Sequence, residues 1–244
     1  MIPSALIEKL RSAHAVAVLT GAGISAESSV PTFRDAQTGL WAKYRAEDLA
    51  TPEAFRRNPK LIWEWYHWRR ERVGSVSPNP GHVALAELEK RVRQFTLITQ
   101  NVDGLHHRAG SKRIIELHGN ILRTKCFDED VLVESWSQTN EVPPRCPRCG
   151  GPFRPDVVWF GEALPAGTFE AAKQAARECD LFSSVGTSTV VYPAAALPDI
   201  ALESGATVVE INPNPTPLTP KAHFSLQGPS GVILPELVKA TWPE

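Results

Sequence analysis

Short runs of apolar residues alternate along the chain with longer segments in which apolar positions recur at helical spacing. Four such runs occupy residues 15–20, 94–99, 181–185 and 206–211. Apolar runs of this length are typical of strands that are buried on both faces of a sheet. Helices are expected at residues 4–12, 60–72, 82–91, near 167–178 and near 193–204. Buried strands that alternate with helices predict an α/β fold with a parallel sheet.

Residues 120–156 interrupt this alternation. They contain three of the four cysteines, several acidic residues and five prolines, which indicates a small module inserted into a larger domain. The expected fold is one domain, residues 1–244, in which a Rossmann-like parallel-sheet lobe carries a smaller, discontinuous lobe that is helical and cysteine-bearing. The predicted large lobe comprises approximately residues 1–41, 78–120 and 157–244, and the small lobe approximately residues 42–77 and 121–156.

The chain has 244 residues, of which 42% are hydrophobic, and a formal net charge of -1. This length and apolar content are enough for a sizeable core. A near-neutral chain gives no reason to expect a nucleic-acid partner. The N-terminal segment carries charges at Glu8, Lys9 and Arg11 and does not resemble a signal peptide. No apolar stretch is long enough to span a bilayer, so we expect a cytoplasmic protein without a membrane partner.

The first expected strand runs directly into Gly21, where the segment GAGISA begins. This segment fits the pattern G-x-G-x-x-G/A. In that pattern the first glycine permits a tight turn, the second lets the backbone approach a pyrophosphate, and the small third residue, here Ala26, permits close packing of helix on strand. The alternative is a glycine-rich turn that binds nothing. An ordinary dinucleotide-binding unit also has a strand with an acidic end about 20 residues later, and here a polar loop, residues 28–35, follows instead.

Five segments together resemble the sirtuin family of NAD-dependent protein deacylases. Residues 21–41 (GAGISAESSVPTFRDAQTGLW) are similar to the cofactor-binding loop of that family. The other segments are TQNVDGLH at residues 99–106, ELHG at 116–119, GTS at 186–188 and NPN at 212–214. They occur in the order of the family and extend over nearly the whole chain.

The resemblance implies that NAD is the co-substrate and assigns roles by position. His118 and Asn101 are the implied catalytic residues, and Ser230 lies where the family makes a further adenine contact. The implied cofactor-binding residues are Gly21, Ala22, Gly23, Ser25, Phe33, Arg34, Asp35, Trp41, Gln100, Asn101, Val102, Asp103, Gly186, Thr187, Ser188, Asn212, Pro213, Asn214 and Ser230.

In sirtuins the carbonyl oxygen of an acyl-lysine attacks C1′ of the nicotinamide ribose and expels nicotinamide, after which a ribose hydroxyl must lose a proton. The resemblance implies that His118 takes that proton, and an imidazole suits this step because it titrates near neutral pH. A lone histidine is otherwise more often a satisfied core or loop residue. Without such context, His82 is interpreted as part of the start of a helix.

Tyr66 and Arg69 are three residues apart in the aromatic segment 60–72, which places both on one face of the expected helix. A guanidinium fork and a phenol hydroxyl suit a carboxylate, and the pair resembles that of the sirtuin subgroup that prefers succinyl- and malonyl-lysine. The alternative is an aromatic helix that packs on the core with Arg69 in solvent. Trp63 and Trp65 are expected to pack.

The segment VVWFGE at residues 157–162 is similar to the family segment beside which the substrate peptide lies extended. Backbone pairing of this kind tolerates many peptide sequences. The expected substrate-binding residues are Tyr66, Arg69, Val158, Phe160 and Gly161, and the expected partners are acyl-lysine proteins or peptides.

Sirtuins commonly hold a structural zinc ion with two CxxC pairs, and here only the pair of Cys146 and Cys149 is intact. Cys126 is present, but Glu129 stands where its partner is expected. Zinc can bind through Cys126, Cys146, Cys149 and an acidic residue or water, it can bind weakly, or the site can be vestigial, and of these outcomes we expect a bound zinc ion with a structural role only. The candidate acidic ligands are Asp128, Glu129 and Asp130, and Cys179 is expected in the core.

Three other functions remain open on the sequence alone. ADP-ribosyl transfer to a protein is one, and a non-catalytic NAD-binding module, or a zinc-ribbon adaptor, is another. A nicotinamide dehydrogenase is the third, and the absent acidic strand end and the segment QNVDG count against it. The sequence gives neither the protein targets nor the oligomeric state.

Overall fold

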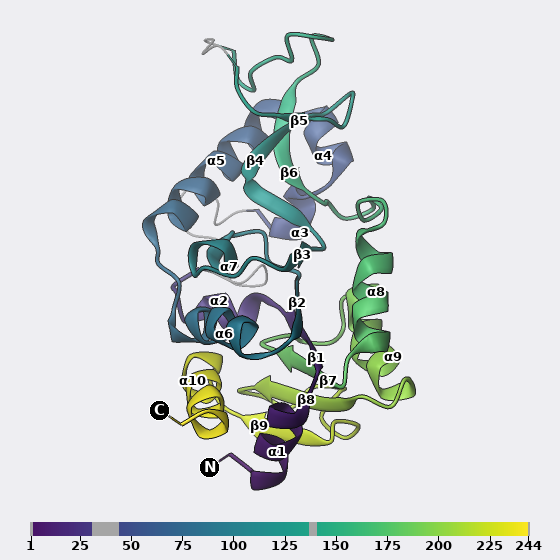
Figure 1. Ribbon diagram of the computed structural model, residues 1–244. Coiled ribbons are helices and arrows are strands. Elements are labelled where there is room, and N and C mark those ends of the chain that lie inside the picture. The colour runs from purple at the N-terminus through teal and green to yellow at the C-terminus, as the bar shows by residue number, and fades with distance from the viewer. Residues whose placement is uncertain (1, 31–43, 137–140, 244) are drawn as a thin grey trace.

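The computed structural model describes residues 2–30, 44–136 and 141–243, and Figure 1 shows their arrangement. A six-stranded sheet occupies one end of the molecule (Figure 1), and all its strand pairs are parallel. The predicted parallel α/β fold is therefore confirmed. In spatial order the strands are β3 (Ile114–Glu116), β2 (Gln94–Thr99), β1 (Ala15–Thr20), β7 (Leu181–Val185), β8 (Thr207–Asn212) and β9 (Phe224–Gln227).

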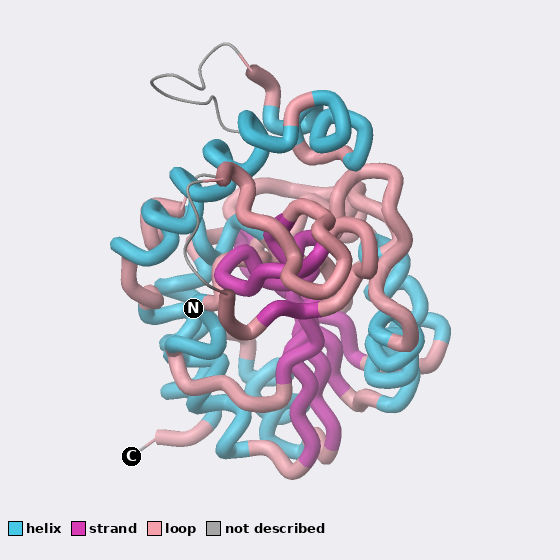
Figure 2. The backbone as a smooth tube through the Cα atoms, turned by 90° about the horizontal axis from the view of Figure 1, so that it is seen from above, coloured by secondary structure: helices cyan, strands magenta, loops and turns pink. Residues whose placement is uncertain are grey.

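Helices cover both faces of this sheet, as the view from above shows (Figure 2). One face packs against α1 (Ser4–Ser12), α6 (Pro80–Arg91) and α10 (Ser230–Thr241), which contribute Leu10, Leu85 and Leu234 among others to one apolar core. The other face packs against α8 (Thr168–Glu178) and α9 (Leu197–Glu203), and Cys179 lies buried in this second core as expected. Coverage of both faces explains why the strands are almost wholly apolar.

A second, antiparallel sheet lies at the other end of the molecule (Figure 1). It contains β5 (Leu132–Val133), β4 (Gly119–Cys126) and β6 (Phe153–Val157), in that order. The helices α4 (Pro52–Arg57) and α5 (Pro59–Ser75) pack against it in a third core that includes Phe55, Trp65 and Trp159, so Trp65 packs as expected. The boundaries of the two predicted lobes stay a prediction. The helix α3 (Ala46–Leu49) also lies near this sheet.

Several elements were not predicted from the pattern. The strands β3 and β9 are short edge strands with few fully buried positions, so they lack a long apolar run. The helix α10 contains Pro235, which obscures its helical pattern. The helix expected near 193–204 divides into a 3₁₀ turn, Ala194–Ala196, followed by α9. Short helices also occur at α2 (Ala22–Ala26) and α7 (Leu105–Arg108). Among the described residues, no helix combines the length and the apolar character needed to cross a bilayer.

Candidate functional site

The strand order reverses between β1 and β7, which are neighbours in the sheet although some 160 residues separate them. Ligands of open α/β sheets bind at the carboxyl ends of strands at such a point. A cavity of about 820 Å³ lies there and extends toward the second sheet. The expected site residues that line it are Gly21, Ala22, Gly23, Ser25, Tyr66, Arg69, Gln100, Asn101, Val102, Asp103, His118, Val158, Phe160, Gly161, Gly186, Thr187 and Ser188.

The glycines that follow β1 and β7 meet each other at the base of this cavity. A Cβ atom on Gly23 would lie 2.7 Å from Cα of Gly186, and one on Gly21 would lie 2.8 Å from the Gly186 oxygen. Gly186 has a φ of +60°, so the left-handed conformation also favours glycine there. The sequence analysis explained the second glycine, Gly23, by the close approach of a pyrophosphate. The structure adds a second reason, because the backbone of Gly186 leaves no room for a Cβ atom on Gly23. The third position differs from the expectation, because Ala26 is exposed and does not pack a helix on a strand.

The other expected cofactor residues are either absent from the cavity lining or not described. Phe33, Arg34, Asp35 and Trp41 lie outside the described residues. Among the described residues, the cavity lining does not include Asn212, Pro213, Asn214 or Ser230. Asn212 instead donates from Nδ2 to the Asn214 carbonyl oxygen at 2.6 Å, and Ser230 donates from Oγ to Oε1 of Glu27 at 2.7 Å.

A buried polar network joins the ends of β1 and β2. The Asn101 side-chain amide donates to the Gly21 carbonyl oxygen at 3.0 Å and to Oγ of Ser25 at 3.1 Å. Burial raises the pKa of the Asp103 carboxyl above its usual range, while the backbone N–H of Leu105, the Ser25 hydroxyl and nearby arginines act in the opposite direction. Asn101 is therefore held in one orientation at the cavity wall.

Ser25 also contacts a pair of buried histidines behind the cavity wall. Oγ of Ser25 lies 3.4 Å from Nε2 of His82, and the His82 and His106 rings are 4.8 Å apart. Burial lowers the pKa of His82 to about 4 and that of His106 to about 3, so both are neutral near pH 7. His82 lies in the first turn of α6 as expected, where it forms a capping box with Asn79.

His118 lies between β3 and β4, where the two sheets meet. Its Nδ1 atom is 2.9 Å from the Gln100 carbonyl oxygen. A carbonyl oxygen only accepts, so Nδ1 carries the proton of the neutral ring and Nε2 is left as the basic nitrogen. Burial lowers the pKa of His118 below its usual value, and the hydrogen bond to Gln100 opposes this shift. A neutral imidazole with an oriented basic nitrogen is suited to accept a proton near pH 7.

Tyr66 and Arg69 reach the same cavity from α5. Tyr66 is 1% exposed, which fits both the predicted acyl recognition and the alternative in which the helix packs on the core. The guanidinium of Arg69 lies 5.0 Å from the centroid of the Trp65 ring and 5.7 Å from that of the Tyr66 ring. Burial lowers the pKa of Arg69, whereas the nearby Tyr66 and Asp103 act to raise it. Arg69 is thus partly buried beside these two rings, and its role in acyl recognition stays a prediction.

The expected substrate-binding residues did not include Trp159 and Glu162, although both belong to the segment 157–162 and line the cavity. The Trp159 indole donates from Nε1 to Oη of Tyr66 at 2.9 Å. Glu162 accepts two bonds from the buried Arg154, at 2.5 and 2.9 Å, and one from the Trp159 backbone N–H at 2.7 Å. The spacing of Arg154 and Glu162 gives no periodic pattern, so only their contact reveals the pair.

The cysteine cluster lies beside the second sheet, where Cys126 ends β4, and none of its members lines the cavity. Cys126, Cys146, Cys149 and Glu129 place their ligand atoms within 4.8 Å of one another. Three thiolates and one carboxylate are a donor set that tetrahedral zinc accepts. Of the three acidic candidates, only Glu129 belongs to the cluster found among the described residues. Its Oε2 atom also lies 3.2 Å from the guanidinium of Arg148, which neutralises part of its charge.

The parallel sheet, the glycine contact at its switch point and the oriented imidazole define a nucleotide-binding α/β protein with an acid–base group in its cleft. A profile of the Sir2 family matches residues 21–193. An NAD-dependent protein deacylase of Pyrococcus furiosus is 56% identical over 236 residues, which cover 94% of this chain and 93% of that protein. NAD-dependent protein deacylase 1 of Pseudomonas aeruginosa is 50% identical over 247 residues, with 98% and 99% covered. The chain belongs to the Sir2 family, and the resemblance to sirtuins is confirmed.

Solved structures agree with this assignment. A Sir2 homologue in complex with NAD superposes with a TM-score of 0.91 at 44% identity, over 99% of this chain and 94% of that one. A Sir2 protein bound to an acetylated peptide superposes with a TM-score of 0.86 at 30% identity, over 98% of both chains.

Proposed function

We propose that this protein is an NAD-dependent protein-lysine deacylase that accepts succinyl and malonyl groups and also acetyl groups. The relatives named NAD-dependent protein deacylase support the deacylase activity. One observation carries the finer assignment: Tyr66 and Arg69 line the same cavity as His118. An arginine in a largely apolar cavity is suited to the carboxylate end of an acyl group.

The residues of the cavity fit NAD. A volume of about 820 Å³ is in the range of cofactor sites. Gly21 and Gly186 line the cavity without side chains, so their backbone is accessible to a bound pyrophosphate. Gln100, Asn101 and Asp103 would hold the nicotinamide ribose and nicotinamide, and Gly186, Thr187 and Ser188 the adenosine half. When bound, NAD supplies the ribose carbon that takes the acyl oxygen as nicotinamide leaves.

The residues of the protein then have separate tasks. His118 accepts a ribose hydroxyl proton at Nε2, because its Nδ1 proton is committed to the Gln100 carbonyl oxygen. The loop with Val158, Phe160 and Gly161 would bind the substrate peptide along its backbone, and the protein partners would be acyl-lysine proteins. A cytoplasmic location stays a prediction.

We propose in addition that Cys126, Cys146, Cys149 and Glu129 hold a structural zinc ion. The site is far along the second sheet from His118 and adds no group to the reaction. The ion would stabilise the small sheet by linking the end of β4, at Cys126, to the segment that carries Cys146 and Cys149.

Incubation with NAD and matched succinyl- and acetyl-lysine peptides tests the proposal. We expect a higher kcat/KM for the succinyl peptide, and we expect Arg69→Met to reduce that preference strongly while His118→Tyr abolishes both activities. Arg72→Met is the matched control, because Arg72 lies on the same helix against Trp68 and does not line the cavity. An equal loss on both peptides in Arg69→Met would contradict the acyl assignment. Mass spectrometry separates O-acyl-ADP-ribose from an ADP-ribosylated protein, and no nicotinamide release would indicate a non-catalytic module.

A further inference from the structure

Trp159 connects the loop beside the cavity to the proposed acyl-recognition pair. It is 2% exposed and lines the cavity together with Tyr66. Its indole nitrogen donates to Oη of Tyr66 at 2.9 Å, and the two rings lie 6.3 Å apart, between centroids. Trp159 therefore touches the phenol of Tyr66 through one hydrogen bond and through ring packing.

The direction of this hydrogen bond has a chemical consequence. An indole N–H is only a donor, whereas a phenol hydroxyl has one proton and two lone pairs. Tyr66 must therefore accept from Trp159, and its own proton must point to a different acceptor. Within the described part of the chain, Tyr66 Oη makes no other hydrogen bond. The indole thus leaves Tyr66 as a donor, beside the cationic Arg69, at the wall of the cavity.

The indole is itself held in place by three other residues, Arg154, Glu162 and Phe55. The guanidinium carbon of Arg154 lies 3.3 Å from the centroid of the Trp159 ring. Glu162 binds that guanidinium through both its oxygens and accepts the Trp159 backbone N–H. The Phe55 ring packs against Trp159 at 5.3 Å between centroids. A ring that is held by a stacked guanidinium, a neighbouring aromatic ring and a bonded backbone N–H presents its indole N–H in one direction, which is what orientation of a second side chain requires.

We propose that Trp159 is a specificity-determining positioning residue: its indole N–H turns Tyr66 into a hydrogen-bond donor for the carboxylate end of an acyl-lysine. This inference rests on the proposed function. Two donors side by side, Tyr66 and Arg69, favour an anionic acyl end over an acetyl methyl group. Without the indole N–H, the Tyr66 hydroxyl is free to rotate and loses part of this preference.

The substitution Trp159→Phe tests the proposal, because it keeps an aromatic ring against Arg154 and removes the N–H. We expect the ratio of kcat/KM for succinyl- over acetyl-lysine peptides to fall about 3- to 10-fold, the effect of one hydrogen bond. Replacement of Trp159 by benzothienylalanine, which has sulfur in place of N–H, gives the same test with an almost unchanged shape if Trp159→Phe does not fold. Trp136→Phe is the control, because Trp136 packs on Phe153 away from the cavity, and it should leave the ratio as it is.

The double variant Trp159→Phe/Tyr66→Phe distinguishes orientation from packing. If Trp159 acts through the Tyr66 hydroxyl, Trp159→Phe lowers the ratio in the wild-type protein and has no further effect on it in Tyr66→Phe. An equal fall in both backgrounds, or an unchanged ratio in Trp159→Phe while Tyr66→Phe lowers it, overturns the inference and leaves the proposed function intact. An unchanged ratio in both Tyr66→Phe and Arg69→Met contradicts the proposed acyl recognition itself, and the inference with it.

Discussion

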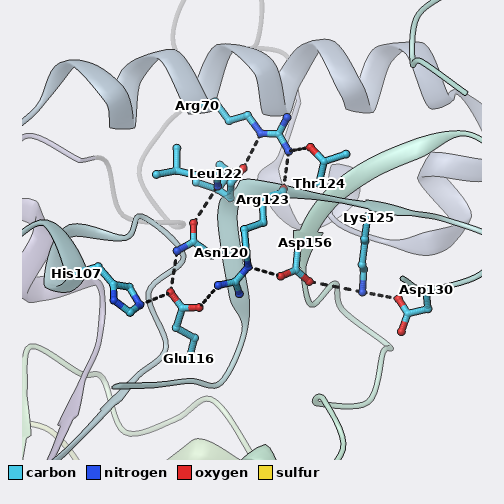
Figure 3. A network of polar contacts seen from close by, with 11 residues as sticks. Arg70, His107, Glu116, Asn120, Leu122, Arg123, Thr124, Lys125, Asp130 and Asp156 are labelled. Carbon is cyan, nitrogen blue, oxygen red and sulfur yellow. Dashed lines mark hydrogen bonds and ion pairs between the residues drawn. The ribbon is translucent and has the colours of Figure 1, made fainter. Parts of the chain in front are cut away.

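Asn120 donates a 2.7 Å hydrogen bond from Nδ2 to Oε1 of Glu116, across the turn that carries His118. Arg123 binds the other oxygen of Glu116 at 2.7 Å and reaches Oδ2 of Asp156 at 2.8 Å (Figure 3). Glu116 ends β3 in the parallel sheet, whereas Asn120 and Arg123 belong to β4 in the antiparallel sheet. The proposed general base is thus held at a polar junction between the two sheets.

The substitution Arg123→Met removes the two ion pairs that Arg123 makes at this junction, with Glu116 and with Asp156. We expect kcat for deacylation to fall on the order of ten-fold, because a small displacement of a catalytic group costs rate. The KM for NAD should change little, because the substitution leaves the contact of Gly21 and Gly23 with Gly186 as it is. Steady-state kinetics with both substrates varied measures the two constants separately.

Arg145→Met is the control for this variant, since Arg145 pairs with Glu141 near the cysteine cluster. It removes one exposed ion pair and should leave kcat unchanged. An unchanged kcat in Arg123→Met would mean that the turn around His118 keeps its conformation without the ion pairs of Arg123 to Glu116 and Asp156.

The depressed pKa of His118 predicts how activity depends on pH. A general base acts when it is neutral, and burial lowers the pKa of His118 below the usual 6.5. Activity should therefore persist below pH 6.5 and fall only when the pH drops through the lowered pKa. Proton NMR titration of the histidine rings, with His118→Gln to assign the signal, measures this pKa directly. An inflection above 6.5 for His118 would contradict the burial argument.

The contact between Gly23 and Gly186 predicts a large cost for one added methyl group. In Gly23→Ala, the new Cβ would meet the Gly186 backbone at 2.7 Å, which neither segment can avoid without moving. We expect a loss of roughly 3 kcal/mol or more in the free energy of unfolding, with loss of NAD binding, measured by urea unfolding and calorimetry.

Gly74→Ala, the same substitution at another glycine, is expected to raise the free energy of unfolding instead of lowering it. Gly74 lies in α5, and a Cβ there meets nothing within 4 Å. Alanine is favoured over glycine in a helix by roughly 0.5–1 kcal/mol, so this variant should be slightly more stable than the wild-type protein. Equal stability of the two alanine variants would refute the packing argument for Gly23.

The cysteine cluster predicts a metal dependence that rests on Glu129. Purified protein should contain about one zinc ion per chain, and Glu129→Ala should lose it to a chelator faster because one of four ligands is removed. Metal analysis after dialysis against a chelator measures the loss. Glu134→Ala, an exposed neighbour outside the cluster, is the control and should retain the metal.

Much of the fold followed from local patterns. The four buried strands were predicted from continuous apolar runs, and the main helices from apolar residues at helical spacing. Both signals are visible in a short window of sequence. The strand β9 was missed because only Leu226 of its four residues is buried, so it has no apolar run. His118, Asn101 and the glycines could be assigned to one site because each lies in a contiguous segment that resembles the sirtuin family.

The sequence by itself therefore determined the fold class, the family and most of the cavity lining, since these depend on periodicity and on contiguous segments. Only the tertiary structure decided that Gly23 is required by Gly186, that Glu129 joins Cys146, and that Trp159 donates to Tyr66. The partners in these pairs are 163, 17 and 93 residues apart, as their numbers and the hydrogen bonds show. Such contacts form only when distant segments of the chain pack together, so a short window of the sequence does not reveal them.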